Sequence, residues 1–231
     1  MPPLAITWLG HSSFSLRTPG GKIVLFDPWY TGNPVFPSTL KPTKADVILI
    51  SHGHSDHITD AAATAKATGA TVVGIWEITS WLGSKGVKSV EPMNKGGTIE
   101  VKGLRITMTE ACHSSSFEEN GTVYLGEPAG FVVRLENGQT IYFAGDTSLF
   151  GDMKLIGELY RPDIAFLPIG DRFTMGPDTA ALAAKWLAVK QVVPMHFGTF
   201  PLLTGTPEQL KQHLAGTAIQ VLALEPGQTA E

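Results

Sequence analysis

The chain has 231 residues, of which 43% are hydrophobic and 16% are charged, and this composition excludes a disordered chain. A formal net charge of −4 provides no general attraction for nucleic acids or anionic membranes, and the single Cys112 excludes an internal disulfide framework. Because we find neither a basic leader with a long apolar run nor an apolar segment of membrane length, we expect a cytoplasmic protein without a membrane partner.

Short strands alternate with helical patterns along the chain, which is typical of a layered α/β protein. In chain order, we expect strands at 5–9, 13–17, 22–26 and 47–51, a helix at 58–68, strands at 71–75, 104–111, 130–135, 140–144 and 163–167, a helix at 178–190, a strand at 192–195 and a helix at 206–214. The turns TPGGK and ENGQ each join two strands as a hairpin. No linker-like segment separates these elements, so we expect one domain over residues 1–231.

The later part of the chain repeats the earlier part at an offset of 117 residues, the separation of Asp46 from Asp163. Identical pairs at this offset include Phe14 and Phe131, Arg17 and Arg134, Gly21 and Gly138, Phe26 and Phe143, and Asp46 and Asp163. This match predicts two similar hairpin-plus-strand units, and therefore two pseudo-equivalent halves packed against each other. The histidines are not repeated, because His52 corresponds to Ile169.

A dense cluster of metal-binding side chains follows one of the apolar strands. The stretch ILISHGHSDHITDA, residues 48–61, contains His52, His54, Asp56 and His57. Sites in α/β proteins favour the carboxyl ends of strands, where side chains stand on a rigid platform. Imidazole and carboxylate groups suit zinc and its first-row neighbours. We therefore interpret the cluster as a metal site, in which the first two histidines reach one ion while Asp56 and His57 turn towards a second.

Five motifs in order carry a resemblance to a known family. HGHSDH matches the HxHxDH motif of the metallo-β-lactamase superfamily. The other four motifs are Asp27 in VLFDP, His113 in EACHSSS, Asp146 in YFAGDTS and His196 in VVPMHFGTF, each after a predicted strand. WLGHSSF, GDRFTMGP and PMHFGTFP resemble more closely the bacterial and archaeal metal-dependent hydrolases of unassigned substrate, which are similar to the ascorbate-phosphate lactonase branch. The resemblance implies a four-layer αββα sandwich with a two-metal site at one edge.

The resemblance also implies the ligand set. Carried over to this sequence, one metal is held by His52, His54 and His113, the other by Asp56, His57 and His196, and Asp146 bridges them. The cofactors are then two divalent metal ions, with zinc as the first choice and manganese, nickel or iron as alternatives. A water shared by two such ions loses a proton near neutral pH and becomes a hydroxide nucleophile. Asp56 lies beside that nucleophile, and Asp27 fits a position behind the ligands, where it orients one of them.

Other residues have competing interpretations. His11 in LGHSSF is either a contact in the pocket or a structural histidine. Arg172 in GDRFTMGP either holds a substrate anion or is solvated. Cys112 is expected to point to the far side of its strand from His113, as a buried, inert thiol rather than a ligand. Packing roles are expected for three tryptophans: Trp76, Trp81 and Trp186.

The favoured function is a metal-dependent hydrolase that acts on a small ester, lactone or phosphoester. The alternative is a nuclease or phosphodiesterase resembling ribonuclease Z, but the chain has no basic run to hold RNA, so nucleic acid is not the expected partner. A third class is a redox or metal-storing protein. We expect a small-molecule substrate, with a homo-oligomer left open, and the motifs specify neither the substrate nor the native metal.

Overall fold

A computed structural model describes residues 2–40 and 42–231 of the chain. The strands are β1 (Ala5–Trp8), β2 (Phe14–Arg17), β3 (Ile23–Phe26), β4 (Val47–Leu49), β5 (Thr71–Ile75), β6 (Val90–Met93), β7 (Thr98–Val101), β8 (Leu104–Glu110), β9 (Ser116–Glu118), β10 (Thr122–Tyr124), β11 (Ala129–Arg134), β12 (Thr140–Phe143), β13 (Ile164–Pro168), β14 (Gln191–Met195), β15 (Gln220–Val221) and β16 (Thr229–Ala230). The helices are α1 (Ser55–Ile58), α2 (Ala61–Thr68), α3 (Trp76–Ser84), α4 (Met153–Tyr160), α5 (Pro177–Leu187) and α6 (Pro207–His213).

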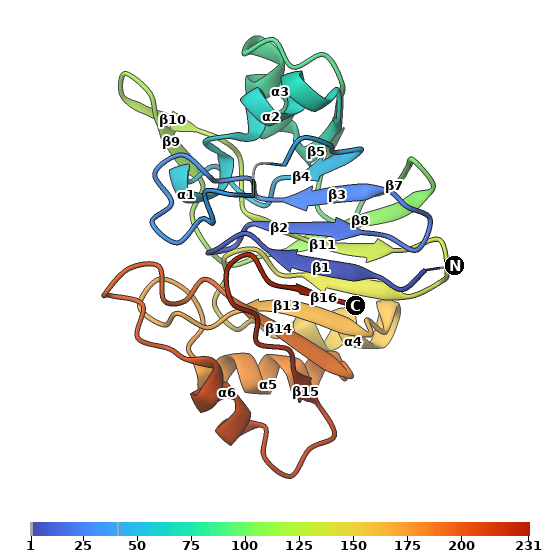
Figure 1. The fold of residues 1–231 in the computed structure, drawn as a ribbon, viewed down its shortest axis with the longest axis vertical. Helices are drawn as coiled ribbons and strands as arrows, with labels where there is room; N and C mark the ends of the chain where they lie inside the picture. The colour runs from blue at the N-terminus through green and yellow to red at the C-terminus, as the bar shows by residue number, and fades with distance from the viewer. Residues whose placement is uncertain (1, 41) are drawn as a thin grey trace.

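Two seven-stranded sheets pack face to face between two layers of helices. The first sheet has the order β16-β1-β2-β3-β4-β5-β6, and the second has the order β15-β14-β13-β12-β11-β8-β7. Helices α1, α2 and α3 lie on the side of the first sheet, and α4, α5 and α6 lie on the side of the second (Figure 1). This arrangement confirms the predicted four-layer αββα sandwich.

The two sheets are built from equivalent units, as the repeat predicts. In the first sheet, the β2–β3 hairpin pairs Phe14 with Phe26, and β4 then joins β3 in parallel. In the second sheet, the β11–β12 hairpin pairs Phe131 with Phe143, and β13 then joins β12 in parallel. The repeated aspartates also have the same task, because each carboxylate accepts a hydrogen bond from the first residue of the neighbouring strand: Asp46 from Ile23, and Asp163 from Thr140.

The repeated aromatic residues meet in the core between the sheets. The rings of Phe26 and Phe143 are stacked with centroids 4.4 Å apart, and Phe14 packs edge to face on Phe166 at 4.9 Å. All four side chains are fully buried, and burying each one contributes roughly 1.5–3 kcal/mol to stability. The duplicated sequence thus supplies both faces of one shared core.

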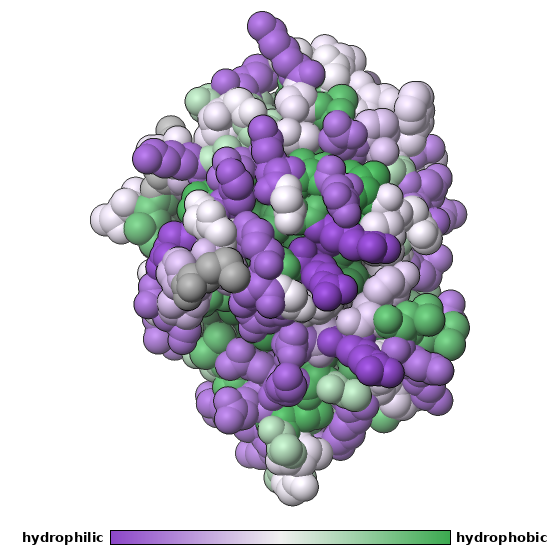
Figure 2. Space-filling view, turned by 90° about the vertical axis from the view of Figure 1, so that its right-hand side faces the viewer, coloured by the Kyte–Doolittle hydropathy of each residue, from purple (hydrophilic) through white to green (hydrophobic). Residues whose placement is uncertain are grey.

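The surface differs from the core in character. Viewed from the end opposite α1, the molecule shows mostly hydrophilic side chains with smaller hydrophobic areas between them (Figure 2). Within the described residues, no helix combines the length and the apolar character that a membrane span needs.

Several local predictions were wrong. The helix expected at 58–68 is divided into α1 and α2, because the Asp60 carboxylate accepts backbone hydrogen bonds from Tyr30 and Thr31 at the break. Helices α3 and α4 were not predicted, and neither were the strands β6, β7, β9, β10, β15 and β16. Trp76 begins α3 at the surface and is 62% exposed, so it has no packing role in the core. Helix α6 begins as expected, with a capping box between Thr206 and Gln209.

Candidate metal centre

The residues singled out in the five motifs lie together at one edge of the sandwich. Each follows the carboxyl end of a strand: Asp27 after β3, the HGHSDH segment after β4, His113 after β8, Asp146 after β12 and His196 after β14. The carboxyl ends of these strands meet at the same edge of the two sheets, so side chains far apart in the sequence converge there. The fold therefore brings together all the predicted ligands.

The first group of side chains consists of His52, His54 and His113. Each offers a ring nitrogen, and these donor atoms lie within 4.8 Å of one another. The closest pair is His52 Nε2 and His54 Nδ1, at 3.0 Å. His52 is fully buried, whereas the other two are partly exposed, so this group opens towards solvent on one side.

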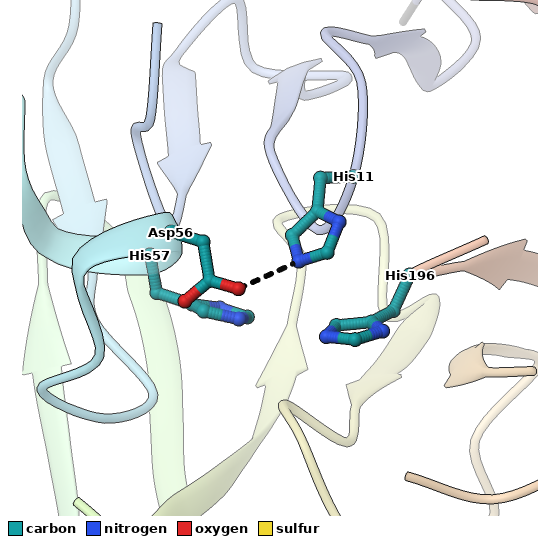
Figure 3. Close-up of side chains that lie close together, drawn as sticks. All are labelled: His11, Asp56, His57 and His196. Atoms are coloured by element: carbon teal, nitrogen blue, oxygen red, sulfur yellow. Dashed lines mark hydrogen bonds and ion pairs between the residues drawn. The ribbon is translucent and has the colours of Figure 1, made fainter. Parts of the chain in front are cut away.

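The second group consists of Asp56, His57 and His196, as predicted, together with His11 (Figure 3). His11 Nε2 lies 3.2 Å from Asp56 Oδ2, and the rings of His11 and His196 have centroids 4.0 Å apart. The structure therefore places the fully buried His11 in contact with the predicted ligands, and its contact with a substrate stays a prediction.

Asp146 lies between the two groups. Its Oδ2 atom is 2.9 Å from His196 Nε2 and 3.3 Å from His57 Nε2 on the side of the second group. The same oxygen is 3.7 Å from His113 Nε2 and 3.9 Å from His52 Nε2 on the side of the first group. One carboxylate oxygen therefore faces donor atoms of both groups.

Several buried polar atoms in this centre have no hydrogen-bond partner among the described residues: Asp146 Oδ1, His57 Nε2 and His196 Nδ1. A buried donor or acceptor left unpaired costs about 1–3 kcal/mol. Three such atoms in one place therefore indicate that a ligand binds there. Imidazole nitrogens and carboxylate oxygens in this number are the donor set of divalent first-row metals. The residues present therefore fit the metals that the motifs imply.

Hydrogen bonds from behind orient the ligand side chains. Asp27 Oδ1 accepts the backbone N–H of Ser51 at 2.8 Å, and Asp27 Oδ2 lies 2.8 Å from His57 Nδ1. Ser51 Oγ is 2.9 Å from His52 Nδ1, and Thr199 Oγ1 is 2.9 Å from His11 Nδ1. In these three histidines the Nδ1 atom is occupied, so the Nε2 atom faces the centre. Asp27 thus has the predicted position, whereas Ser51 and Thr199 were not predicted.

The backbone is strained at three positions of the centre. His11, Asp27 and His196 have φ angles of 56°, 41° and 56°, in the left-handed region that non-glycine residues rarely occupy. Each such residue costs of order 1–3 kcal/mol unless its surroundings hold it. The backbone N–H of His196 donates to the carbonyl oxygen of His11 at 3.1 Å, and this bond joins two of the strained turns.

The electrostatic environment favours metal-binding forms of these side chains in the metal-free protein. Burial, followed by the neighbouring histidines, lowers the pKa of His11 to about 4 and the pKa of His52 well below its usual value. Burial alone raises the pKa of Asp146, but the charges of His196 and His57 outweigh it and hold the pKa well below the usual range. Neutral imidazoles and an ionised carboxylate are the forms that bind metal ions.

His57 is the exception in this environment. Burial lowers its pKa, but the carboxylates of Asp146 and Asp27 outweigh burial and raise the pKa well above its usual value. Metal binding at His57 needs the deprotonated nitrogen and therefore competes with this proton.

Two other predicted residues lie apart from the groups. Arg172 is exposed, with its guanidinium carbon 5.7 Å from the ring centroid of Phe173. The prediction of a buried Cys112 was wrong, because its side chain is exposed. The strand alternation does not continue to this residue, since β8 ends at Glu110 and the Cys112 N–H donates to Thr147 Oγ1 instead.

Comparison with known proteins gives consistent matches over nearly the whole chain. Residues 5–196 match the family described as "Beta-lactamase superfamily domain". The chain is 49% identical to a UPF0173 metal-dependent hydrolase of Solibacter usitatus, over 99% of this chain and 100% of the relative. It is 51% identical to one of Rubrobacter xylanophilus, over 96% of this chain and 94% of the relative. The solved structure of Igni18, a novel metallo hydrolase from the archaeon Ignicoccus hospitalis, is 38% identical and has a TM-score of 0.89, covering 98% of this chain and 97% of that one.

Proposed function

This chain belongs to the beta-lactamase superfamily and is a metal-dependent hydrolase, and from that premise we propose that it binds two divalent metal ions and hydrolyses a small ester, lactone or phosphoester. Zinc is the first candidate for both ions, with manganese, nickel or iron as alternatives. The narrower link to the ascorbate-phosphate lactonase branch stays a prediction.

The position of Asp146 carries the proposal of two ions. Its Oδ2 atom lies within 3.9 Å of the Nε2 atoms of four histidines, two from each group: His52 and His113, and His57 and His196. A site for a single ion needs no carboxylate oxygen between two separate groups of nitrogen donors. We therefore assign His52, His54 and His113 to one ion, Asp56, His57 and His196 to the other, and Asp146 to both.

The protein's own groups prepare the reaction around these ions. Two bound divalent ions lower the pKa of a water molecule and polarise the oxygen of the substrate that is attacked. Asp56 has a side chain that is 28% exposed, and we propose that its carboxylate, besides holding an ion, accepts a hydrogen bond from the attacking water.

His11 and Asp27 position two of the ligands through hydrogen bonds. The hydrogen bond between His11 and Asp56 fixes the orientation of that carboxylate, and the charge of His57 acts with it. Burial raises the pKa of Asp56, but these two interactions outweigh it and keep the carboxylate ionised, so that it accepts and does not donate. Asp27 holds His57 in place through its Nδ1 atom. Arg172, exposed on the loop after β13, is proposed to attract an anionic part of the substrate.

Metal analysis and a substrate screen test the proposed function. The protein purified without chelator should contain up to two divalent ions per chain, measured by plasma mass spectrometry. The metal-loaded protein is then tested on lactones, esters, thioesters and phosphodiesters, with structured RNA at several salt concentrations as the nuclease arm. Saturation at a single ion per chain would contradict the two-metal assignment. Cleavage of RNA without activity on any small substrate would favour the nuclease instead.

A further inference from the structure

The loop that follows β14 brings an aromatic side chain to the second metal group. Phe200 lies 5.9 Å from the ring of His11, measured between centroids, in an edge-to-face arrangement. His11 itself contacts Asp56 and His196 of that group. Phe200 is 38% exposed, whereas His11 is fully buried, so part of the phenyl ring faces solvent beside the buried His11.

Phe200 is held in a defined position. Trp29 packs against it with ring centroids 6.0 Å apart, and Trp29 is itself buried and fixed by a hydrogen bond from Nε1 to the carbonyl oxygen of Thr31 at 2.9 Å. A rigid aromatic ring with one solvent-facing side gives a ligand apolar contact at little cost in conformational entropy. The next exposed apolar side chain on the loop is Leu202, which is 49% exposed.

The mouth of the site has a different character beside the first metal group. There the exposed Ser114 hydroxyl lies 3.3 Å from His54 Nε2. The centre is therefore bordered by a polar group on the side of His54 and by a phenyl ring on the side of His11. A substrate that spans the centre meets hydrogen-bonding groups at one end and hydrocarbon at the other.

We propose that Phe200 forms an apolar subsite that binds the hydrocarbon chain of the substrate's acyl group, and that the substrates are carboxylic esters with acyl chains longer than acetyl. This inference rests on the proposed hydrolase function. Hydrolysis of such an ester joins the oxygen of water to the carbonyl carbon and breaks the bond from that carbon to the alkoxy oxygen. One proton of water goes to the alcohol, and the acid releases the other, so the reaction needs no oxidant or reductant.

A series of nitrophenyl esters tests the subsite. We compare kcat/KM of the metal-loaded protein for the acetyl, butyryl and hexanoyl esters, in the parent and in Phe200→Ala, Phe200→Leu and Leu202→Ala. Covering a methylene with apolar surface is worth about 0.8 kcal/mol, or about fourfold, so the parent should prefer butyryl, with two more methylenes, over acetyl by roughly fifteenfold. Phe200→Ala should remove this preference, Phe200→Leu should keep part of it, and Leu202→Ala, the control on the same loop, should keep it.

Binding measurements separate this inference from the proposed function. Calorimetric titration with acetate, butyrate and hexanoate should show affinity that rises with chain length in the parent and not in Phe200→Ala. Chain-length-dependent binding without ester hydrolysis would retain the subsite and contradict the ester hydrolase. An equal loss of activity on all three esters in Phe200→Ala, or a change of oligomeric state without a change of preference, would overturn the subsite and assign Phe200 to supporting His11 or to a contact between subunits.

Discussion

The loop after β4 and the loop after β13 occupy equivalent places in the two sheets but have different tasks. The first carries His52, whose ring faces the metal centre, and the second carries Ile169 at the corresponding position, fully buried in apolar surroundings. The second loop packs against ligand-bearing segments: the Ile169 N–H donates to the carbonyl oxygen of Met195, next to His196. Of the two equivalent loops, the loop after β4 thus carries candidate metal ligands, and the loop after β13 packs against a segment that carries another.

The loop after β13 packs closely against the loop that carries His196. A Cβ atom added to Gly170 would lie 2.1 Å from the carbonyl oxygen of His196, so only glycine allows the two loops to approach this closely. The strained turn at His196 is held by this contact as well as by its hydrogen bond to His11. The loops after β4 and after β13 therefore have equivalent positions in the two sheets but different side chains, and both contribute to the same candidate site.

A large effect on both ions is expected where the two halves meet, at Asp146. Asp146→Asn keeps the shape of the side chain but removes its charge, so the metal content should fall towards one ion per chain. Turnover should fall by about a thousandfold or more, equivalent to about 4 kcal/mol of transition-state stabilisation. Metal analysis and single-turnover kinetics measure both quantities. Two retained ions with normal turnover would show that this carboxylate is not shared.

A matched pair of substitutions tests the division of tasks between the loops. His52→Ala should lower the metal content and abolish hydrolysis with little change in the unfolding of the metal-free protein. Ile169→Ala should lower the free energy of unfolding by about 2–5 kcal/mol, because it leaves a cavity in the core, while the folded protein keeps its metals. Denaturant unfolding of the metal-free forms and metal analysis provide the readouts. Equal loss of metal in His52→Ala and Ile169→Ala would contradict the proposed division of tasks between the two loops.

A smaller effect is expected behind the ligands. Asp27→Asn removes the charge that orients His57 through Nδ1, so metal affinity or activity should fall by about 10- to 100-fold. Asp46→Asn provides the control, because it makes the same substitution at the amino end of β4, where the Asp46 carboxylate accepts the backbone N–H of Ile23. Competition titration with a chelator measures the affinity. Unchanged metal affinity in Asp27→Asn would show that the Asp27 charge does not orient the ligands.

The smallest effect is expected at Arg172 on the supporting loop. An exposed charge contributes about 0.2–1 kcal/mol, so Arg172→Ala should raise KM for an anionic substrate about two- to fivefold and leave kcat unchanged. Arg105→Ala, on the exposed face of β8, serves as the control and should change neither constant. A fall in kcat would instead place Arg172 in the chemical step.

Ten strands, β1–β5, β8 and β11–β14, and the cluster of candidate ligands could be predicted because each leaves a pattern in the sequence, whereas β6, β7, β9, β10, β15 and β16 were missed. Apolar runs between turn residues marked the hairpins, and HGHSDH marked the centre. Helix α3 leaves a weaker pattern, because Ile, Thr and Trp have low helix propensity, and it forms because Ile78 and Leu82 are buried against the first sheet.

The supports of the ligands could not be predicted for a different reason. Ser51 and Thr199 act through single hydrogen bonds from their hydroxyl groups, and serine and threonine occur throughout the chain in other roles. The role proposed for Phe200 depends on the fold, which places its ring beside His11, a residue 189 positions earlier in the sequence. Proximity of this kind depends on tertiary structure and leaves no local signal.

The pairing of β16 with β1 links the order of synthesis to the order of folding. The side chains of Thr7 and Thr229 meet across this pair, 222 residues apart in sequence, and β16 closes the edge of the first sheet. On the ribosome, the first sheet waits with the edge of β1 unpaired until residue 230 has emerged. An unpaired edge invites association with other chains, and long-range pairing slows folding, so the late pairing of β16 is the step that covers this edge of β1.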